Sequence, residues 1–180
     1  MELILERELE HQQKAIDALM SVLDGVSIVK PYLAYENPSF DRKELRLTNN
    51  LLEVQKKIRV DYRGCHDDGN YLNLDVKMET GTGKTYVYTQ TIYEMHKRFG
   101  FNKFIIAVPS LSIKAGTSQF IADSYVKHHF SDACGYNCDI ELGVLESPKK
   151  KKKGFLAMPA PVRDFVSGSC QNSNKIYVLL

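Results

Sequence analysis

The feature that most constrains the fold of this chain is the glycine-rich stretch Met78-Glu79-Thr80-Gly81-Thr82-Gly83-Lys84-Thr85. It follows an alternating segment at 71–77 and precedes a helical pattern at 85–99. A strand, a glycine turn and a helix in this order are the context that a phosphate-binding loop requires. Two glycines would let backbone N–H groups turn inward at the positive end of the helix, where phosphate oxygens bind. The stretch therefore predicts a nucleotide site.

Each residue type in this loop has an expected chemistry. Lys84 would reach the β and γ phosphates, and the Thr85 hydroxyl is placed to ligate Mg²⁺, so these two are the candidate catalytic residues. The common pattern G-x-x-x-x-G-K-[ST] has a glycine where this chain has Met78, and an ordinary glycine turn before a helix is the alternative. The expected cofactor-binding residues of the loop are Thr80, Gly81, Thr82, Gly83, Lys84 and Thr85.

The apolar pattern around the loop predicts a βαβ unit. Residues 71–77 alternate between apolar and polar, and 104–108 form a continuous apolar run closed by Pro109, as in a central parallel strand. The helix at 85–99 joins them, with Gly100 as its end. Such a unit predicts an α/β fold with a parallel sheet and helices on its faces. The expected buried stripe of the helix is Tyr88, Ile92, Met95 and Phe99.

Further elements follow from the same periodicities. Helices are expected at 11–23, 47–58 and 118–130, with a helical turn at 162–166. Strands are expected at 139–145 and 175–180. In the helix at 118–130 the inward residues would be Phe120, Ile121 and Tyr125.

Two regions look less regular. Residues 26–70 read as an irregular and partly helical insertion, because short apolar pieces alternate there with proline and asparagine. Residues 146–156 read as a flexible lysine-rich loop, since five consecutive lysines repel one another and stay solvated. The four cysteines, at 65, 134, 138 and 170, do not form the tight pairs of zinc ribbons, and no structural metal is expected.

Composition narrows the partners very little. The formal net charge is +2 with 26% charged residues, so a nucleic-acid signal must come from local clusters. No apolar run reaches the length of a membrane span, and the acidic start does not match a signal peptide. A cytoplasmic protein is expected.

Three stretches resemble the motifs of one family of DNA motors. Residues 74–88, which contain the glycine loop, look like the first helicase motif of superfamily 2. Residues 104–117, Phe-Ile-Ile-Ala-Val-Pro-Ser-Leu-Ser-Ile-Lys-Ala-Gly-Thr, are similar to the next motif of type III restriction endonucleases. Residues 9–16 resemble their upstream glutamine motif, although His11 stands where many relatives have Tyr. Most of the chain thus resembles the Res subunits of type III restriction endonucleases.

This resemblance implies a three-layer RecA-like P-loop sheet, mostly parallel with helices on both faces. It places residues 1–180 in the N-terminal part of the first RecA-like motor domain, as an incomplete lobe. The implied cofactors are ATP and Mg²⁺, and the implied partners are DNA and a methyltransferase (Mod) subunit. In the full-length protein, ATP hydrolysis would drive movement on DNA and double-strand cleavage.

The resemblance also implies residue roles outside the loop. Gln12 would read the adenine edge through its paired amide donor and acceptor. The alternative for Gln12 is an exposed polar residue on the first helix. Phosphates of a DNA strand would meet hydroxyls, backbone N–H groups and a lysine along the later motif. The residues concerned are Pro109, Ser110, Lys114 and Thr117, for which a strand-ending turn with a solvated lysine is the alternative.

Parts of a motor are missing from the sequence. Hydrolysis needs a carboxylate at a strand end to hold Mg²⁺, and no apolar run followed by Asp-Glu occurs after Thr85. The segment alone is therefore expected to lack efficient ATPase activity and nuclease activity. Two other classes stay open, a different P-loop enzyme such as a small kinase, and a non-catalytic nucleic-acid-binding module that uses the lysine run.

Overall fold

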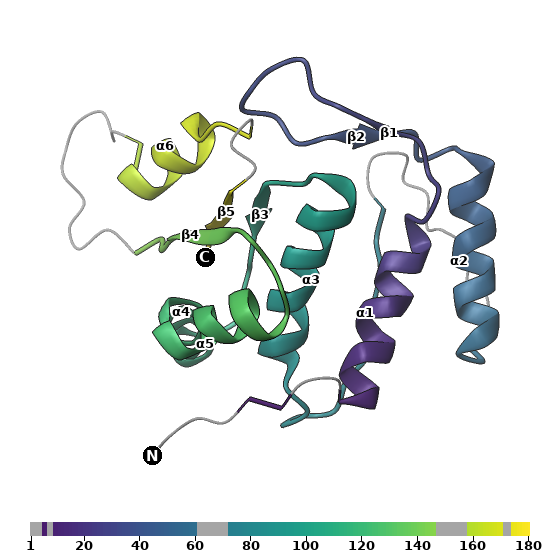
Figure 1. The fold of residues 1–180 in the computed structure, drawn as a ribbon, viewed down its shortest axis with the longest axis horizontal. Helices are drawn as coiled ribbons and strands as arrows, with labels where there is room; N and C mark the ends of the chain where they lie inside the picture. Colours follow the sequence, from purple (N-terminus) through teal and green to yellow (C-terminus); the bar gives the residue numbers. More distant parts are fainter. Residues whose placement is uncertain (1–4, 7–8, 61–71, 147–157, 171–173) are drawn as a thin grey trace.

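The computed structural model describes residues 5–6, 9–60, 72–146, 158–170 and 174–180 (Figure 1). Helices and strands are interspersed along the described chain, and three of the five strands lie in its C-terminal half. In chain order the elements are α1 (Glu10–Val22), β1 (Ile28–Val29), β2 (Ser39–Phe40), α2 (Leu45–Lys57), α3 (Lys84–Phe99), β3 (Lys103–Ile105), α4 (Leu111–Ala122), α5 (Ser124–His128), the π-helical turn η1 (His129–Ala133), β4 (Asp139–Gly143), α6 (Ala160–Ser167) and β5 (Lys175–Leu179).

The main sheet is parallel, as predicted. In the described part of the chain it has three strands in the order β3-β5-β4, with Lys103 opposite Tyr177 and Ile140 opposite Ile176. The central strand is β5, so the prediction of a central strand at 104–108 is wrong. That strand is shorter, lies at the edge, and leaves the Ile105 side chain 70% exposed.

The strand predicted at 71–77 is absent from the part that the structure describes. Residues 72–79 belong to no helix or strand. Leu72 and Leu74 pack against the cluster around α2, while Asp75 and Lys77 stay exposed. Burial between helical layers would desolvate both charges, which explains why the alternating pattern does not enter the sheet. The βαβ unit predicted around the loop is therefore not formed, whereas β4, α6 and β5 do form one.

The first three helices confirm their predictions, but α3 is buried on two sides. Its Tyr86 and Tyr93 belong to the core cluster that includes residues of the sheet, and its Val87 packs against α1. Of the predicted stripe only Ile92 is fully buried, because a helix covered on two sides has no single apolar face. Gly100 ends α3 in the left-handed conformation, with φ of 76°, as expected.

The helix predicted at 118–130 begins earlier and is interrupted. α4 starts at Leu111, and a new helix starts after Asp123, whose side chain accepts hydrogen bonds from the backbone N–H groups of Tyr125 and Val126 at 2.8 and 3.2 Å. Because of the interruption, residues of α5 do not continue the faces of α4. As a result Tyr125 is 43% exposed, and Val126 is buried instead.

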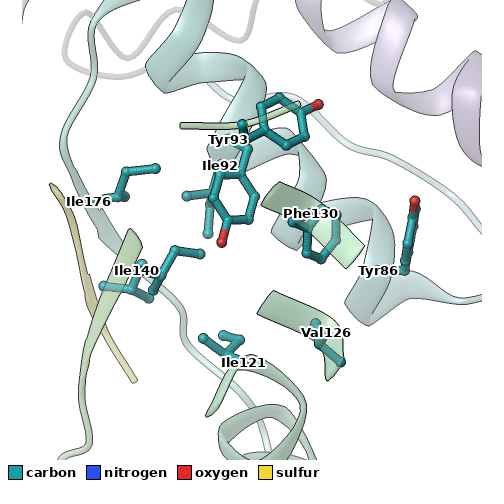
Figure 2. Close-up of a cluster of buried hydrophobic side chains, with 10 residues drawn as sticks. Tyr86, Ile92, Tyr93, Ile121, Val126, Phe130, Ile140 and Ile176 are labelled. Carbon is teal, nitrogen blue, oxygen red and sulfur yellow. The ribbon is translucent and has the colours of Figure 1, made fainter. Parts of the chain in front are cut away.

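The core lies between the sheet and α3, α4 and α5, where aromatic rings fill the space (Figure 2). Tyr93 stacks on Tyr136 with a centroid distance of 4.9 Å, and Phe130 lies 5.0 Å from Tyr93. On the other face of the sheet, α6 places Pro161 against Gly143 (Figure 1). The α/β class with helices on both faces of a parallel sheet is thus observed for three strands, while the complete RecA-like arrangement stays a prediction.

The region predicted as an irregular insertion contains more order than expected. β1 and β2 pair in antiparallel fashion, with Ile28 opposite Phe40, and α2 follows them. Residues 61–71 and 147–157 lie outside the described residues, and so does nearly all of the lysine-rich loop predicted at 146–156. None of the helices in the described ranges has the length and apolar content needed to cross a membrane.

Candidate nucleotide site and its surroundings

The glycine loop leads directly into α3. Gly81 and Gly83 have φ of 83° and 82°, a conformation that glycine adopts at low cost. Gly83 is the N-cap of α3, so Lys84 and Thr85 form its first turn. The first N–H groups of a helix have no partner within the helix, and the helix dipole is positive there. The loop therefore has the backbone geometry of an anion site.

The loop is closed by its own hydrogen bonds. The Glu79 carbonyl accepts from the Thr82 hydroxyl at 2.7 Å and from the Lys84 Nζ at 2.5 Å. The Lys84 side chain is otherwise exposed, and Thr80 and Gly81 are exposed beside it. Among the described residues this ammonium group contacts one loop carbonyl, and it can exchange that contact for a phosphate, which is a stronger, charge-assisted partner.

The N-terminal end of α1 holds the loop from the other side. The Gln12 Nε2 donates to the Thr82 carbonyl at 3.1 Å, and the His11 Nε2 lies 3.1 Å from the same oxygen. Gln12 is only 6% exposed, so the alternative of an exposed polar residue is wrong for it. Its Oε1 is buried and finds no hydrogen-bond partner among the described residues. His11, which no sequence signal marked as a site residue, is therefore part of the loop's support.

Two further residues fix the loop in place. Met78, at the position where the common pattern has glycine, packs against the buried Ile16, Met20 and Val87. At Gly83, an added Cβ would lie 2.3 Å from the Gln12 Nε2. Met78 thus anchors the start of the loop to α1, and Gly83 permits the close approach of Gln12.

Thr85, the predicted Mg²⁺ ligand, lies in the first turn of α3. Among the residues that the structure describes, no group of three or more His, Cys, Asp or Glu side chains could hold a metal ion. Thr85 is half-buried, and its carbonyl accepts from the Thr89 hydroxyl at 2.7 Å. Mg²⁺ usually keeps several waters and takes the rest of its ligands from phosphates and one or two protein oxygens. The role of the Thr85 hydroxyl as this protein oxygen stays a prediction.

The four residues predicted to line DNA do not form one open surface. Pro109 and Ser110 are exposed at the turn after β3, and the Ser110 hydroxyl caps α4 by accepting from the Ile113 N–H at 3.3 Å. Lys114 is half-buried, and its Nζ donates to the Leu145 carbonyl. Thr117 is 2% exposed, and its hydroxyl is 2.8 Å from the Tyr88 hydroxyl. In this arrangement Thr117 serves the interior, not a surface.

A buried polar pair that no local sequence pattern indicates involves Tyr86, in the first turn of α3. The Tyr86 hydroxyl is 3.0 Å from the His129 Nε2, and these residues are 6% and 8% exposed. The pair joins the first turn of α3 to the π-helical turn η1. Such turns are rare and often occur at functional sites.

Burial also shifts the ionisation of groups deeper in this core. It raises the pKa of Cys138 to about 11 and raises the pKa of Tyr93 and Tyr136 above their usual value. The Tyr136 hydroxyl donates to Glu94 at 2.5 Å, which raises its pKa further. These groups stay neutral at physiological pH and support the fold.

A separate cavity of about 490 Å³ lies at the other end of α3, away from the glycine loop. Its wall comes from the C-terminal turn of α3 and from the β1–β2 connection, and it includes Pro31, Leu33, His96, Phe99 and Asn102. It contains none of the residues predicted to bind nucleotide or DNA. This cavity therefore serves as a second, alternative place on the molecule against which nucleotide binding at the glycine loop can be tested.

Comparisons with known proteins agree on one family. The family model described as "Type III restriction enzyme, res subunit" matches residues 7–179. The EcoPI Res subunit of Escherichia phage P1 is 40% identical over an alignment that covers 97% of this chain and 18% of the relative. The EcoP15I Res subunit of Escherichia coli is 38% identical, and its alignment covers 98% of this chain and 18% of the relative. The StyLTI Res subunit of Salmonella typhimurium is 35% identical, with 98% of this chain and 16% of the relative covered. The chain thus spans less than a fifth of the length of these relatives.

Proposed function

Because this chain belongs to the family of type III restriction enzyme Res subunits, we propose that it is the ATP-binding part of an ATP-dependent DNA motor. We assign residues 1–180 to the N-terminal part of the first RecA-like motor domain. In the full-length protein the motor would couple ATP hydrolysis to movement on DNA and to double-strand cleavage. A methyltransferase subunit would be its partner, and the cytoplasm its location.

The observation that carries this proposal is the glycine loop at the start of α3. Two glycines with positive φ and the N-terminal end of the helix form an anion cradle in this proposal, with Lys84 next to it. In the proposal Lys84 leaves the Glu79 carbonyl to bind the β and γ phosphates. Thr85 would be the residue that holds Mg²⁺, which would neutralise charge on the phosphates.

The support of the loop fits an adenine nucleotide. The Gln12 Oε1 is a buried acceptor that has no partner among the described residues, and such an atom is costly to leave unpaired. The exocyclic amine of adenine is a donor that could satisfy it. Since the Gln12 Nε2 already binds the Thr82 carbonyl, adenine recognition and loop position would depend on the same side chain.

The chain's own residues bind and orient the nucleotide in this proposal, and the phosphate anhydride supplies the energy when it is hydrolysed. A Mg²⁺-binding carboxylate after an apolar run is missing from the sequence beyond Thr85. We therefore propose that the chain by itself binds ATP with little turnover and has no nuclease activity.

For DNA we propose contacts from the turn after β3. Pro109 and Ser110 are exposed there, and Lys114 lies on the next turn of α4. These residues would contact phosphates without reading bases. We leave Thr117 out of the direct contacts because its side chain is buried.

Calorimetric titration of ATP with Mg²⁺ tests the nucleotide site. We expect the wild-type chain to release binding heat and the Lys84→Ala variant to lose at least about tenfold in affinity, since a charge-assisted contact to phosphate is lost. The matched control is Lys77→Ala, which removes an exposed lysine upstream of the loop and should bind like the wild type. Equal affinities for wild type and Lys84→Ala would contradict the proposal.

A further inference from the structure

We propose that the hydrogen bond between Tyr88 and Thr117 couples the glycine loop to α4, the helix that carries the candidate DNA contacts. The inference rests on the proposed function, since it takes nucleotide to bind at Lys84 and DNA to bind near Ser110 and Lys114. It makes Tyr88 and Thr117 positioning residues. Neither residue touches nucleotide or DNA.

The bond joins two helix faces that each lead to a ligand. On α3, Tyr88 lies three residues after Thr85 and therefore on the same side of the helix. On α4, Thr117 lies three residues after Lys114 and seven after the N-cap Ser110, again on one side. Three residues, about 4.5 Å along the helix axis, separate Tyr88 from Thr85 and Thr117 from Lys114.

Burial makes this bond a firm connection. Thr117 is 2% exposed, and Tyr88 is half-buried, with 2.8 Å between the two oxygens. A buried hydroxyl that loses its partner keeps its desolvation cost, so the two hydroxyls are expected to move together. A displacement of the first turns of α3 would then be passed to α4.

On α4, Lys114 makes a contact that a movement of this helix could break. The Lys114 Nζ donates to the Leu145 carbonyl just beyond β4, so it is not free for phosphate in this arrangement. A shift of α4 relative to β4 would release it. The structure has Lys114 on the carbonyl, and the proposal adds a second arrangement with Lys114 on DNA, which the state of the loop would favour or disfavour.

The test measures how nucleotide changes DNA affinity. Fluorescence anisotropy of a labelled 24-base-pair duplex gives the affinity of this chain with and without a non-hydrolysable ATP analogue and Mg²⁺. We expect the nucleotide to change the wild-type affinity by about fivefold or more. Tyr88→Phe and Thr117→Val should each reduce that ratio to below about twofold, the double variant should be no worse than either, and Thr117→Ser, which keeps the hydroxyl, should retain it.

The conservative variants separate coupling from folding and from binding. Affinity for each ligand alone should stay within about twofold of wild type, since neither residue touches a ligand. A second readout needs no DNA: in the wild type, nucleotide should change the hydrogen exchange of amides in α4, and in Tyr88→Phe it should not.

The outcomes distinguish this inference from the function on which it rests. Absence of Lys84-dependent ATP binding would contradict the proposed function. The wild type could bind both ligands while nucleotide leaves its DNA affinity unchanged, and this result would overturn only the coupling. The same holds if nucleotide changes the DNA affinity of Tyr88→Phe as much as that of the wild type. Weaker DNA binding by Thr117→Val in the absence of nucleotide would also overturn it, because Thr117 would then act on DNA directly.

Discussion

At the scale of single residues, the two loop glycines have nearly the same positive φ but different surroundings. Gly81 and Gly83 differ by 1° in φ, and an added Cβ meets nothing within 4 Å at Gly81 but lies 2.3 Å from the Gln12 Nε2 at Gly83. The pair therefore separates the cost of backbone strain from the cost of displacing Gln12.

We predict that Gly81→Ala lowers the free energy of unfolding by about 1 kcal/mol, the cost of a left-handed alanine. Gly83→Ala should lower it by about 2 to 3 kcal/mol, because Gln12 must also give up the Thr82 carbonyl. Urea unfolding followed by circular dichroism measures both. Equal losses would show that Gln12 does not hold the loop as described.

Residue spacing in the sequence was enough to locate Lys84 and Thr85 at a helix start after two glycines. It could not reveal that His11 approaches the Thr82 carbonyl, or that Tyr86 meets His129, because these contacts join residues far apart in sequence. Thr117 was assigned to the surface by resemblance alone. Its burial follows from the packing of α4 against α3, which no local pattern encodes.

At the scale of elements, the interruption between α4 and α5 depends on one cap. Asp123 accepts from two backbone N–H groups at the start of α5, and aspartate and asparagine are similarly good in this position.

We predict that Asp123→Ala destabilises the fold by about 1 kcal/mol, while Asp123→Asn stays within about 0.5 kcal/mol of wild type. The reason is that asparagine keeps a side-chain oxygen for the two N–H groups and alanine does not. The midpoint of urea denaturation measures the difference. A stable alanine variant, or an asparagine variant as weak as alanine, would show that the cap does not define the start of α5.

Elements with one clear periodicity were predictable, including α1, α2, β4 and β5, and α3 was predictable from the glycine loop before it and Gly100 after it. The segment at 71–77 was not, since alternation describes a half-buried strand and says nothing about whether a sheet edge is available. The position of β5 in the centre of the sheet also had no local signal. Strand order depends on pairing between distant segments, as the register of Tyr177 with Lys103 illustrates.

At the scale of the whole molecule, buried tyrosine and cysteine side chains that are neutral in the folded state should make the fold less stable as the pH rises through the alkaline range. Burial raises the pKa of Tyr93, Tyr136 and Cys138, the last to about 11. The folded chain therefore holds these protons more tightly than the unfolded chain. Their contribution is complete below the unfolded pKa values, near 8.5 for Cys and 10 for Tyr, and is lost as pH rises through the folded values.

We predict that the thermal midpoint falls steadily between pH 9 and 11 after a plateau below pH 8. Tyr136→Phe removes one of the titrating groups, so its midpoint should fall less steeply over the same range, whatever its stability at neutral pH. Differential scanning calorimetry in matched buffers measures the slopes. A wild-type midpoint that does not change up to pH 11 would contradict the assignment of these groups as buried and neutral.

The central claim is that nucleotide binds at the glycine loop and uses α1 as its support. Peptide-resolved hydrogen exchange with and without ATP and Mg²⁺ tests it most directly. The account predicts slower exchange at 79–87 and at the N-terminal end of α1, with no direct protection of the 490 Å³ cavity walls at 30–38 and 99–102. Protection confined to those cavity walls, with the loop unchanged, would contradict it.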